Sequence, residues 1–393
     1  MPPYQTPGVF IEEQDTGAHP ILAVGTSTAG FVGTAPIGDY GKGEAIPVDN
    51  WSQFYKLFVG DKGKTTDLAN AVNGFFLNGG SRCYIANIAA DEAVSVGLAA
   101  LNLIDEIAIV AAPGRCDQQS YNALIDACEL LKDRVAILDG PAIVDDAEQL
   151  TRVGIDDGGS GGGGGGKTPK PPKPGLKPKQ TSYAACYAPH LKVADAIDPS
   201  VIVTAPPSGH MAGIWASTDS TRGVHKAPAN VSVRGAIGLT KIFSSAEQGP
   251  LNDAGVNIIR FFTREGIRVW GARTLDPTGN WKYLNVRRLF TMIEESIAIS
   301  TRWVIFEPND RPLWNDIKRD IGNFLRVLHS QGALAGDRPE QAFFVKCDRE
   351  TNPPEIIDLG QVVVVVGIAP VKPAEFLIIR IGQSQAGTSV ETA

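Results

Sequence analysis

A strand–helix–strand pattern in the first half of the chain constrains the fold most strongly. EIAIVAAPG (106–114) and RVAILDG (134–140) are apolar strand candidates, and the helix predicted between them carries Leu124, Cys128 and Leu131 on one face. Apolar strands joined by an amphipathic helix pair in parallel, because the helix carries the chain back across the sheet. The sequence therefore predicts an α/β fold, with a parallel sheet covered by helices.

Helix and strand patterns continue to alternate along the chain. Strands are predicted at AVGTSTAGFVG (23–33), CYIAN (83–87) and VIVTAPP (201–207), and helices at LANAVNGFFLNGG (68–80) and GHMAGIWAS (209–217). At 393 residues and 43% apolar content the chain exceeds one ordinary domain, so two domains are expected.

The C-terminal third repeats this mixture of elements. One predicted helix has an apolar face of Leu289, Met292, Ile293 and Ile297, and the next, capped by Asn309 or Asp310, has Leu313, Ile317, Ile321, Leu325 and Leu328. Strands are predicted at WVIF (303–306), FFVKC (343–347), QVVVVVG (361–367) and EFLIIRIG (375–382).

The run from Gly255 to Trp314 is rich in recognition residues. It holds four of the six Trp and many Arg, but no His and no Cys, which favours packing and protein contact over catalysis. The segment from Arg260 to Arg288 contains seven basic and two acidic residues, which gives it a local charge of +5. Such a patch predicts an acidic partner, and Glu12, Glu13 and Asp15 near the start of the chain are acidic. Arg and aromatics also suit nucleic-acid stacking, but most of these aromatics fall in apolar, strand-like runs and predict core packing instead.

The segment GVFIEE (8–13) is a strand candidate without a nearby hairpin partner. Two interpretations remain open for it. It pairs with the sheet edge of another subunit, or it is an edge strand of its own domain.

A low-complexity insert occupies residues 154–180. Within it, GGGGGGKT (161–168) matches the phosphate-binding loop pattern, which requires a strand before it and a helix after it. The segment PKPPKPG that follows cannot begin a helix, so we interpret the match as compositional and expect no cofactor. A solvent-facing position is predicted, and deletion of residues 158–178 should leave assembly intact.

Composition excludes several classes of protein. A net charge of −7 argues against a dedicated nucleic-acid binder. Five scattered Cys without a C-x-x-C pair indicate free thiols in a reducing compartment, and the five His show no metal-ligand spacing. The first ten residues lack the features of a secretory signal, and the longest apolar stretch (362–371) is about half of a membrane span, so no membrane insertion is expected.

The main enzymatic alternative is a serine hydrolase. Asp139 ends a predicted strand, and Ser208 and His210 lie at a strand-to-helix turn. No G-x-S-x-G elbow is present, and Ser208 and His210 are too close in sequence to assign separate roles. We instead expect Ser208 to cap the helix and His210 to lie in its first turn, without catalysis.

Several long stretches carry a resemblance to a known family. They are TPGVFIEE, GVHKAPAN, LNDAGVNIIRFF, GIRVWGARTL, WKYLNVRRLF, FEPNDRPLW, FLRVLHSQGAL, AFFVKCDRETNPP and GIAPVKPAEFLIIRIGQ. Together they resemble the tail sheath proteins of contractile bacteriophage tails and of phage-derived contractile injection systems. The resemblance covers nearly the whole chain outside the insert.

The resemblance implies a fold and a domain plan. It implies an N-terminal arm (1–20), a subtilisin-like α/β domain without a catalytic set (21–270), a C-terminal sheath domain (271–382) and a short tail (383–393). It also implies subunits stacked as six-fold rings in a helical sleeve that contracts. The implied partners are other copies of the chain, an inner tube protein, and baseplate and tail terminator or cap proteins, after production in the cytoplasm.

Terminal arms exchange strands between neighbouring subunits in this family. The resemblance therefore implies exchange through Val9, Phe10, Ile11, Glu12, Phe376, Leu377, Ile378 and Ile379. EFLIIRIG is either a donated arm or the edge that receives one. Candidate electrostatic contacts between subunits are Glu12, Glu13, Arg260, Arg264, Arg268, Arg287 and Arg288.

Overall fold

A parallel sheet forms the centre of the larger unit. The computed structural model describes residues 19–144, 146–154, 174–376 and 378. Eight strands lie in the order β11-β10-β6-β5-β4-β1-β3-β2, and only β2 and β11 at the two edges run antiparallel. Their bounds are β1 (Ala29–Gly33), β2 (Ile46–Val48), β3 (Cys83–Asn87), β4 (Ile109–Ala111), β5 (Val135–Asp139), β6 (Ala184–Ala188), β10 (Val256–Phe262) and β11 (Gly266–Val269). The predicted parallel α/β sheet is confirmed.

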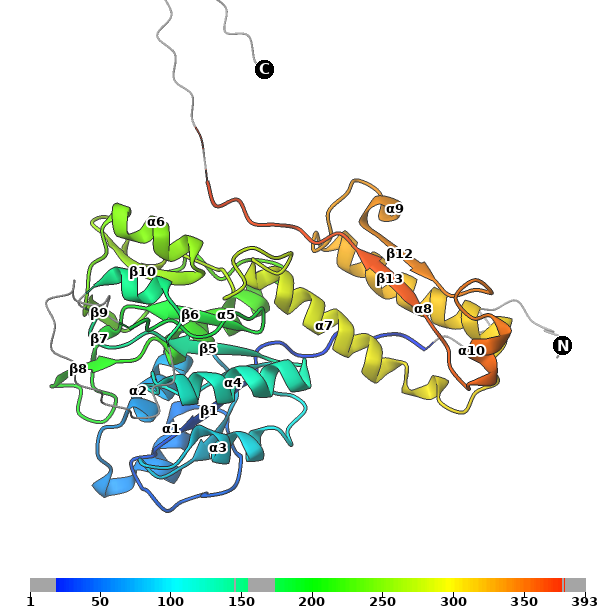
Figure 1. Ribbon diagram of the computed structural model, residues 1–393. Helices are drawn as coiled ribbons and strands as arrows, with labels where there is room; N and C mark the ends of the chain where they lie inside the picture. Colours follow the sequence, from blue (N-terminus) through cyan, green and yellow to red (C-terminus); the bar gives the residue numbers. More distant parts are fainter. Residues whose placement is uncertain (1–18, 145, 155–173, 377, 379–393) are drawn as a thin grey trace, which may run out of the picture.

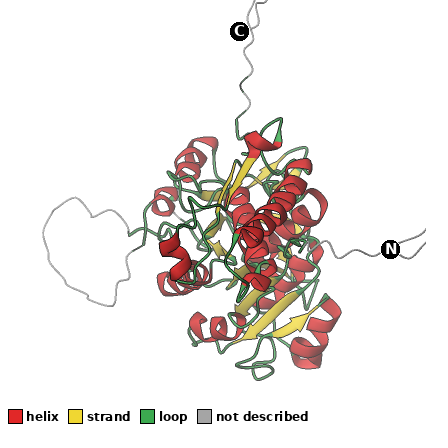
Figure 2. Cartoon of the chain, turned by 90° about the vertical axis from the view of Figure 1, so that its right-hand side faces the viewer, coloured by secondary structure: helices red, strands yellow, loops and turns green. Residues whose placement is uncertain are grey.

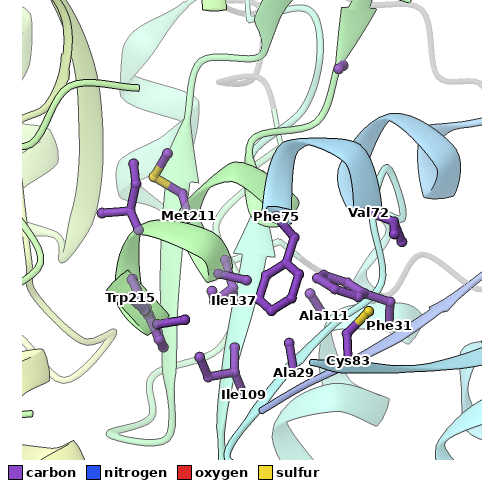
Figure 3. Packing of buried hydrophobic residues seen from close by; sticks show 14 of the residues in the cluster. Ala29, Phe31, Val72, Phe75, Cys83, Ile109, Ala111, Ile137, Met211 and Trp215 are labelled. Carbon is purple, nitrogen blue, oxygen red and sulfur yellow. The ribbon is translucent and has the colours of Figure 1, made fainter. Parts of the chain in front are cut away.

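Helices cover both faces of this sheet (Figure 1). Helices α2 (Asp67–Leu77) and α5 (Ser208–Arg222) pack on one face, and α3 (Val94–Leu101) and α4 (Gln118–Leu131) pack on the other. Successive strand residues point to opposite faces, so Phe31 belongs to the first core and Val32 to the second. Figure 3 shows the first core, where Phe75 from α2 and Trp215 from α5 approach the sheet. We call this unit the body.

Glycine sets how closely α2 and α5 approach each other. A Cβ added at Gly209 would lie 2.1 Å from the carbonyl oxygen of Ala71, and one added at Gly74 would lie 2.3 Å from the His210 ring. No larger residue fits at either position unless the helices separate.

Smaller elements complete the body. A three-stranded antiparallel sheet, in the order β8-β7-β9, holds the strand predicted at 201–207. The remaining elements are α1 (Trp51–Phe54), a π-helical turn (Tyr55–Val59), 3₁₀ turns (Gly60–Lys62, Ala147–Thr151), β7 (Leu191–Ala194), β8 (Ile202–Ala205), β9 (Ala236–Leu239) and α6 (Ser245–Asp253).

Helix α7 (Leu284–Ser300) leaves the body and leads into a smaller C-terminal unit (Figure 1). That unit also contains a 3₁₀ turn (Arg302–Val304), α8 (Arg311–Ser330), α9 (Pro339–Ala342), β12 (Phe343–Lys346), α10 (Pro354–Asp358) and β13 (Val365–Ile368). Its core joins Leu289, Met292 and Ile293 of α7 to the apolar face of α8, as predicted. Asp310 caps α8 by accepting a hydrogen bond from the Leu313 N–H at 3.2 Å. Figure 2 views the molecule from the side of the C-terminal unit, whose helices lie in front of the body.

The strand predicted at WVIF (303–306) is wrong. Arg302–Val304 forms a 3₁₀ turn, and Ile305 and Phe306 lie exposed in the loop before α8. Aromatic and β-branched residues favour strands, but this segment joins two helices that share one core, and the packing of that core overrides the local preference.

Two further predictions fall largely outside the described residues. GVFIEE (8–13) lies wholly outside them. Of EFLIIRIG, only Glu375, Phe376 and Ile378 are described, and none of these three is in a strand. No helix within the described ranges is long and apolar enough to cross a membrane.

Candidate assembly surfaces

The residues of the hydrolase alternative form a buried contact of another kind. Asp139 ends β5, and its carboxylate accepts hydrogen bonds from the Ser208 N–H (2.7 Å), the Ser208 hydroxyl (2.8 Å) and the Gly114 N–H (3.1 Å). Burial raises the pKa of Asp139 to about 6, and these three donors oppose the rise. The cap expected from Ser208 is wrong, because Pro207 holds the N-cap position and the Ser208 hydroxyl turns to Asp139.

His210 lies in the first turn of α5, as expected, but it takes no part in the Ser208–Asp139 contact. It is buried against α2, its Nδ1 has no partner within the described part of the chain, and burial lowers its pKa to about 4. The hydroxyl of Ser208 therefore bonds to a carboxylate rather than to an imidazole. This arrangement does not supply the serine–histidine contact that a hydrolase requires.

Arg288 is an internal residue. It is 4% exposed, and its guanidinium forms two bonds with the Asp219 carboxylate, at 3.0 and 2.5 Å. It also donates to the Thr26 carbonyl at 2.8 Å and lies 4.8 Å from the centre of the Trp215 ring. Every side of this cation is occupied within one subunit.

Arg287 is internal as well. It is 3% exposed, pairs with Glu294 at 2.9 Å and lies over the rings of Trp281 (4.1 Å) and Tyr183 (4.8 Å). The expected exposure of Arg287 and Arg288 to neighbouring subunits is therefore wrong, because the fold uses both charges to fix α7 against the body.

Three other arginines lie at the β11 edge of the large sheet. Arg260 and Arg268 face each other across β10 and β11, and Arg264 is exposed in the turn between them. Gln248 accepts a hydrogen bond from Arg260 at 2.7 Å, and Glu265 pairs with Arg268 at 2.9 Å. Like charges opposite each other on a sheet repel, so this face favours an acidic partner. Glu12 and Glu13 lie outside the described residues, so their predicted contact with this face stays a prediction.

Within the described residues, strands β12 and β13 form a two-stranded sheet. A groove of about 440 Å³ runs between β12 and the exposed side of α8, lined by Asn315, Gly322, Asn323, Arg326, Phe343 and Phe344. Phe344 is 57% exposed there. A two-stranded sheet is marginal alone, and its outer edges can pair with further strands.

The described part of the C-terminal segment returns to the body (Figure 1). Arg273, 2% exposed, donates to both carboxylate oxygens of Glu375, at 2.9 and 2.5 Å. Sequence reasoning missed this contact, because the two residues are 102 positions apart. Their types gave one signal, since Arg273 belongs to the basic run and Glu375 is the first residue of the strand candidate EFLIIRIG.

The N-terminal segment follows α7 from the body to the C-terminal unit (Figure 1). Near the body, the Thr26 hydroxyl donates to Asp219 at 2.6 Å, and further along the Val24 N–H donates to Ser296 at 3.0 Å. At the far end the His19 ring stacks on Trp303 with centroids 4.2 Å apart. The described chain thus begins beside the loop that joins α7 to α8.

Within the described ranges, no group of three or more His, Cys, Asp or Glu side chains is placed so that it could hold a metal ion. The five cysteines are free, and burial raises the pKa of every one of them. What the surface offers is sheet edges, a groove, a basic edge and terminal segments, which suit protein contact.

Comparison with known proteins identifies the family. Residues 86–275 match the model of the phage tail sheath protein central domain, and residues 276–384 match that of the phage tail sheath C-terminal domain. A prophage major tail sheath protein of Pseudomonas aeruginosa is 24% identical over 284 residues, which cover 68% of this chain and 62% of that protein. The chain thus spans less than two thirds of the length of this curated relative.

Solved structures match over almost the full length of both chains. The sheath of the extracellular contractile injection system PVC, in the contracted state, superposes with a TM-score of 0.79 at 30% identity, covering 98% of this chain and 99% of that chain. The helical sheath of the anti-feeding prophage, also contracted, gives 0.75 at 29% identity, covering 97% and 100%. This chain belongs to the tail sheath family of contractile phage tails and contractile injection systems.

Proposed function

We propose that this chain is the structural subunit of a contractile sheath. Copies polymerise as stacked six-fold rings around an inner tube, and contraction drives the tube through a target envelope. The observation that carries the proposal is the match to sheath subunits of contracted injection systems over nearly all of both chains. The family shared with phage tail sheaths and the protein-contact surfaces described above support it.

Neighbouring copies are joined by exchanged strands. The arm segment around Val9, Phe10, Ile11 and Glu12 is the donated strand, and the β12–β13 sheet is its receiver. The open outer edges of that sheet and the groove beside β12 support this assignment. Each backbone hydrogen bond gained contributes about 1 kcal/mol net, and alternate side chains fill the groove. The segment Phe376–Ile379 is a second strand of exchange, donated or receiving, beyond the Arg273–Glu375 anchor.

The division of the chain supports a contraction made of rigid-body movements. The arm (1–20) and the tail (383–393) flank two packed units, the first assigned to 21–270 with a relation to the subtilisin-like architecture and the second to 271–382. Leu275 is nonetheless buried in the core of the body, so we place the spatial junction in α7. Exchanged strands keep copies connected while these units rotate between an extended and a contracted lattice.

Further partners follow from the same proposal. They are the inner tube protein, the baseplate proteins and the tail terminator or cap proteins, all met after production in the cytoplasm. The chain acts mechanically, without catalysis and without a cofactor.

Electron microscopy tests the central proposal. Negative-stain micrographs of the purified full chain should contain tubes or cogwheel fragments, and an active-serine probe should not label the protein. Particles that remain single subunits under all assembly conditions would refute the sheath proposal. Labelling of Ser208 would instead revive the hydrolase alternative.

Strand exchange has a separate test in Ile11→Pro. Proline removes a backbone donor from the arm and resists pairing in a sheet, so tubes should be lost while the subunit unfolds at the wild-type temperature. Thr16→Pro, placed outside GVFIEE, is the matched control and should still assemble. Normal tubes from Ile11→Pro, seen by microscopy and sedimentation, would remove the arm from the exchange.

A further inference from the structure

Two exposed apolar side chains occupy the loop between α7 and α8. Phe306 is 101% exposed and Ile305 is 65% exposed. Phe306 also adopts φ 74°, a left-handed backbone conformation that bulky residues avoid because the Cβ then crowds the following carbonyl oxygen. One phenylalanine thus combines backbone strain with complete exposure, and neither helps a lone subunit.

Local contacts hold this loop in place. The Ile305 N–H donates to the Arg302 carbonyl at 3.2 Å, and the Glu307 N–H donates to the Val304 carbonyl at 3.1 Å. Asn309 donates to the Gln361 carbonyl at 2.8 Å, tying the loop to the segment after α10. The Phe306 ring is therefore presented on a fixed turn, and a partner that covers it need not order the loop first.

The position of the loop indicates which partner covers it. The described chain begins at His19, whose ring stacks on Trp303 and whose N–H donates to Asp320 at 3.2 Å. Glu13, the last residue of GVFIEE, lies six positions before His19. Six extended residues span at most about 20 Å. A copy that receives GVFIEE as a strand must therefore lie within that reach of Trp303, beside Phe306.

We propose that Ile305 and Phe306 form an apolar anchor that seats on the neighbouring copy receiving the N-terminal arm of the same subunit. This inference rests on the proposed strand exchange. The arm and the anchor then grip one neighbour at two points. The second contact forms at the high effective concentration set by the first, so both together resist the pull of contraction better than the arm alone. An aromatic side chain buried at the centre of a contact is a typical hot spot.

Substitutions at 306 separate the side chain from the backbone strain. Phe306→Ala removes the ring and keeps the strain, whereas Phe306→Gly removes the ring and tolerates the left-handed backbone. Both should raise the critical concentration for assembly at least tenfold, measured by sedimentation of the full chain. Leu103→Ala, which truncates an 81% exposed residue of the body, is the matched control and should leave it unchanged.

A photo-crosslinker identifies the occupant. Benzoylphenylalanine at position 306 should yield a covalent dimer of the chain in assembled tubes, with the attached peptide mapping near β12 and β13, and the dimer should vanish in Ile11→Pro. Unchanged assembly of both 306 variants, or crosslinks only within one chain or to a different protein, would overturn the anchor. Wild-type protein that forms no tubes would refute the proposed function itself, an outcome distinct from wild-type tubes that ignore position 306.

Discussion

At the scale of single residues, we expect buried charges to affect the stability of this chain more than exposed charges do. Arg288 and Asp219 are 3% and 4% exposed at their side chains and bond through both carboxylate oxygens. The pair fixes α7 to α5, because Asp219 lies on α5 and Arg288 on α7. Removing only one partner of such a buried ion pair lowers the stability of the fold strongly, because the other charge stays buried without compensation.

We expect Asp219→Asn to lower the free energy of unfolding by about 3–5 kcal/mol, because it leaves the Arg288 cation buried without a counter-ion. Urea unfolding of the unassembled subunit, followed by circular dichroism, measures the change. The double substitution Asp219→Leu with Arg288→Met should recover most of the loss. Asp39→Asn, at an exposed ion pair, is the control and should leave stability unchanged. A loss as small as that of the control would contradict the prediction.

At the scale of elements, α7 is the connection on which the arrangement of the two units depends. Its Glu295 borders a small pocket with Asp133 and Val135 at the start of β5. Burial raises the pKa of Glu295 to about 7, the Asp133 and Asp105 carboxylates add to the rise, and Arg134 opposes it. We therefore expect the docking of α7 on the body to depend on pH near neutrality.

This sensitivity predicts the effect of Glu295→Gln. The folded pKa lies above the ordinary value of 4.5, so the stability linked to this group is complete below pH 4.5 and is lost as pH rises through 7. Water screens the half-exposed carboxyl and limits the change to about 1 kcal/mol. The free energy of unfolding should be measured at pH 5 and pH 8. Relative to wild type, Glu295→Gln should be more stable at pH 8 than at pH 5 by about 1 kcal/mol. An equal difference at both pH values would exclude Glu295 as the source.

The insert is the second element with a clear test. Its flanks are paired, since the Gly154 N–H donates to the Lys177 carbonyl at 2.9 Å and the Leu176 N–H donates to the Gln149 carbonyl at 2.8 Å. Lys177 is buried as well. Deletion of 158–178, expected from sequence to be harmless, would therefore remove packed residues.

We expect deletion of residues 158–172 to preserve both folding and assembly, because long surface loops shorten at little cost when their ends are already paired. The longer deletion of 158–178 should lower the melting temperature by several degrees, and it serves as the contrast. Thermal unfolding and electron microscopy of both variants measure the difference. Loss of tubes on deletion of residues 158–172 would show that the insert itself has a structural role in assembly.

At the scale of the whole molecule, the charged surface that remains for neighbours is narrower than the sequence indicated. With Arg287 and Arg288 buried, the basic edge reduces to the exposed Arg264 and the half-buried Arg260 and Arg268 on the β10–β11 hairpin. The proposed acidic partner is Glu12 and Glu13 of a neighbouring copy or a similar surface. Charge reversal at Arg287 and Arg288 would therefore test folding rather than assembly, because both side chains are buried within one subunit.

We expect Arg260→Glu combined with Arg264→Glu to weaken tube formation at 50 mM salt about tenfold without lowering the melting temperature. Added salt should shrink the difference from wild type, because ions screen exposed charges beyond a Debye length of about 8 Å at physiological salt. Light scattering across a salt series measures this, with Lys192→Glu on β7 as control. Assembly equal to wild type at every salt concentration would remove the basic edge from the contact.

The sequence by itself determined most of the elements and indicated the family. Apolar runs located the parallel strands, and a 3.6-residue period located the apolar faces of α7 and α8, because both patterns depend on residues close in the sequence. The sequence narrowed the cap of α8 to Asn309 or Asp310, and the structure shows that it is Asp310. Only the tertiary structure decided what each charged or aromatic residue does. Arg288 meets a carboxylate 69 positions away, and Arg273 meets one 102 positions away. Phe306, with strand-like neighbours, lies exposed in the loop between α7 and α8, because the shared core of these two helices overrides the local strand preference.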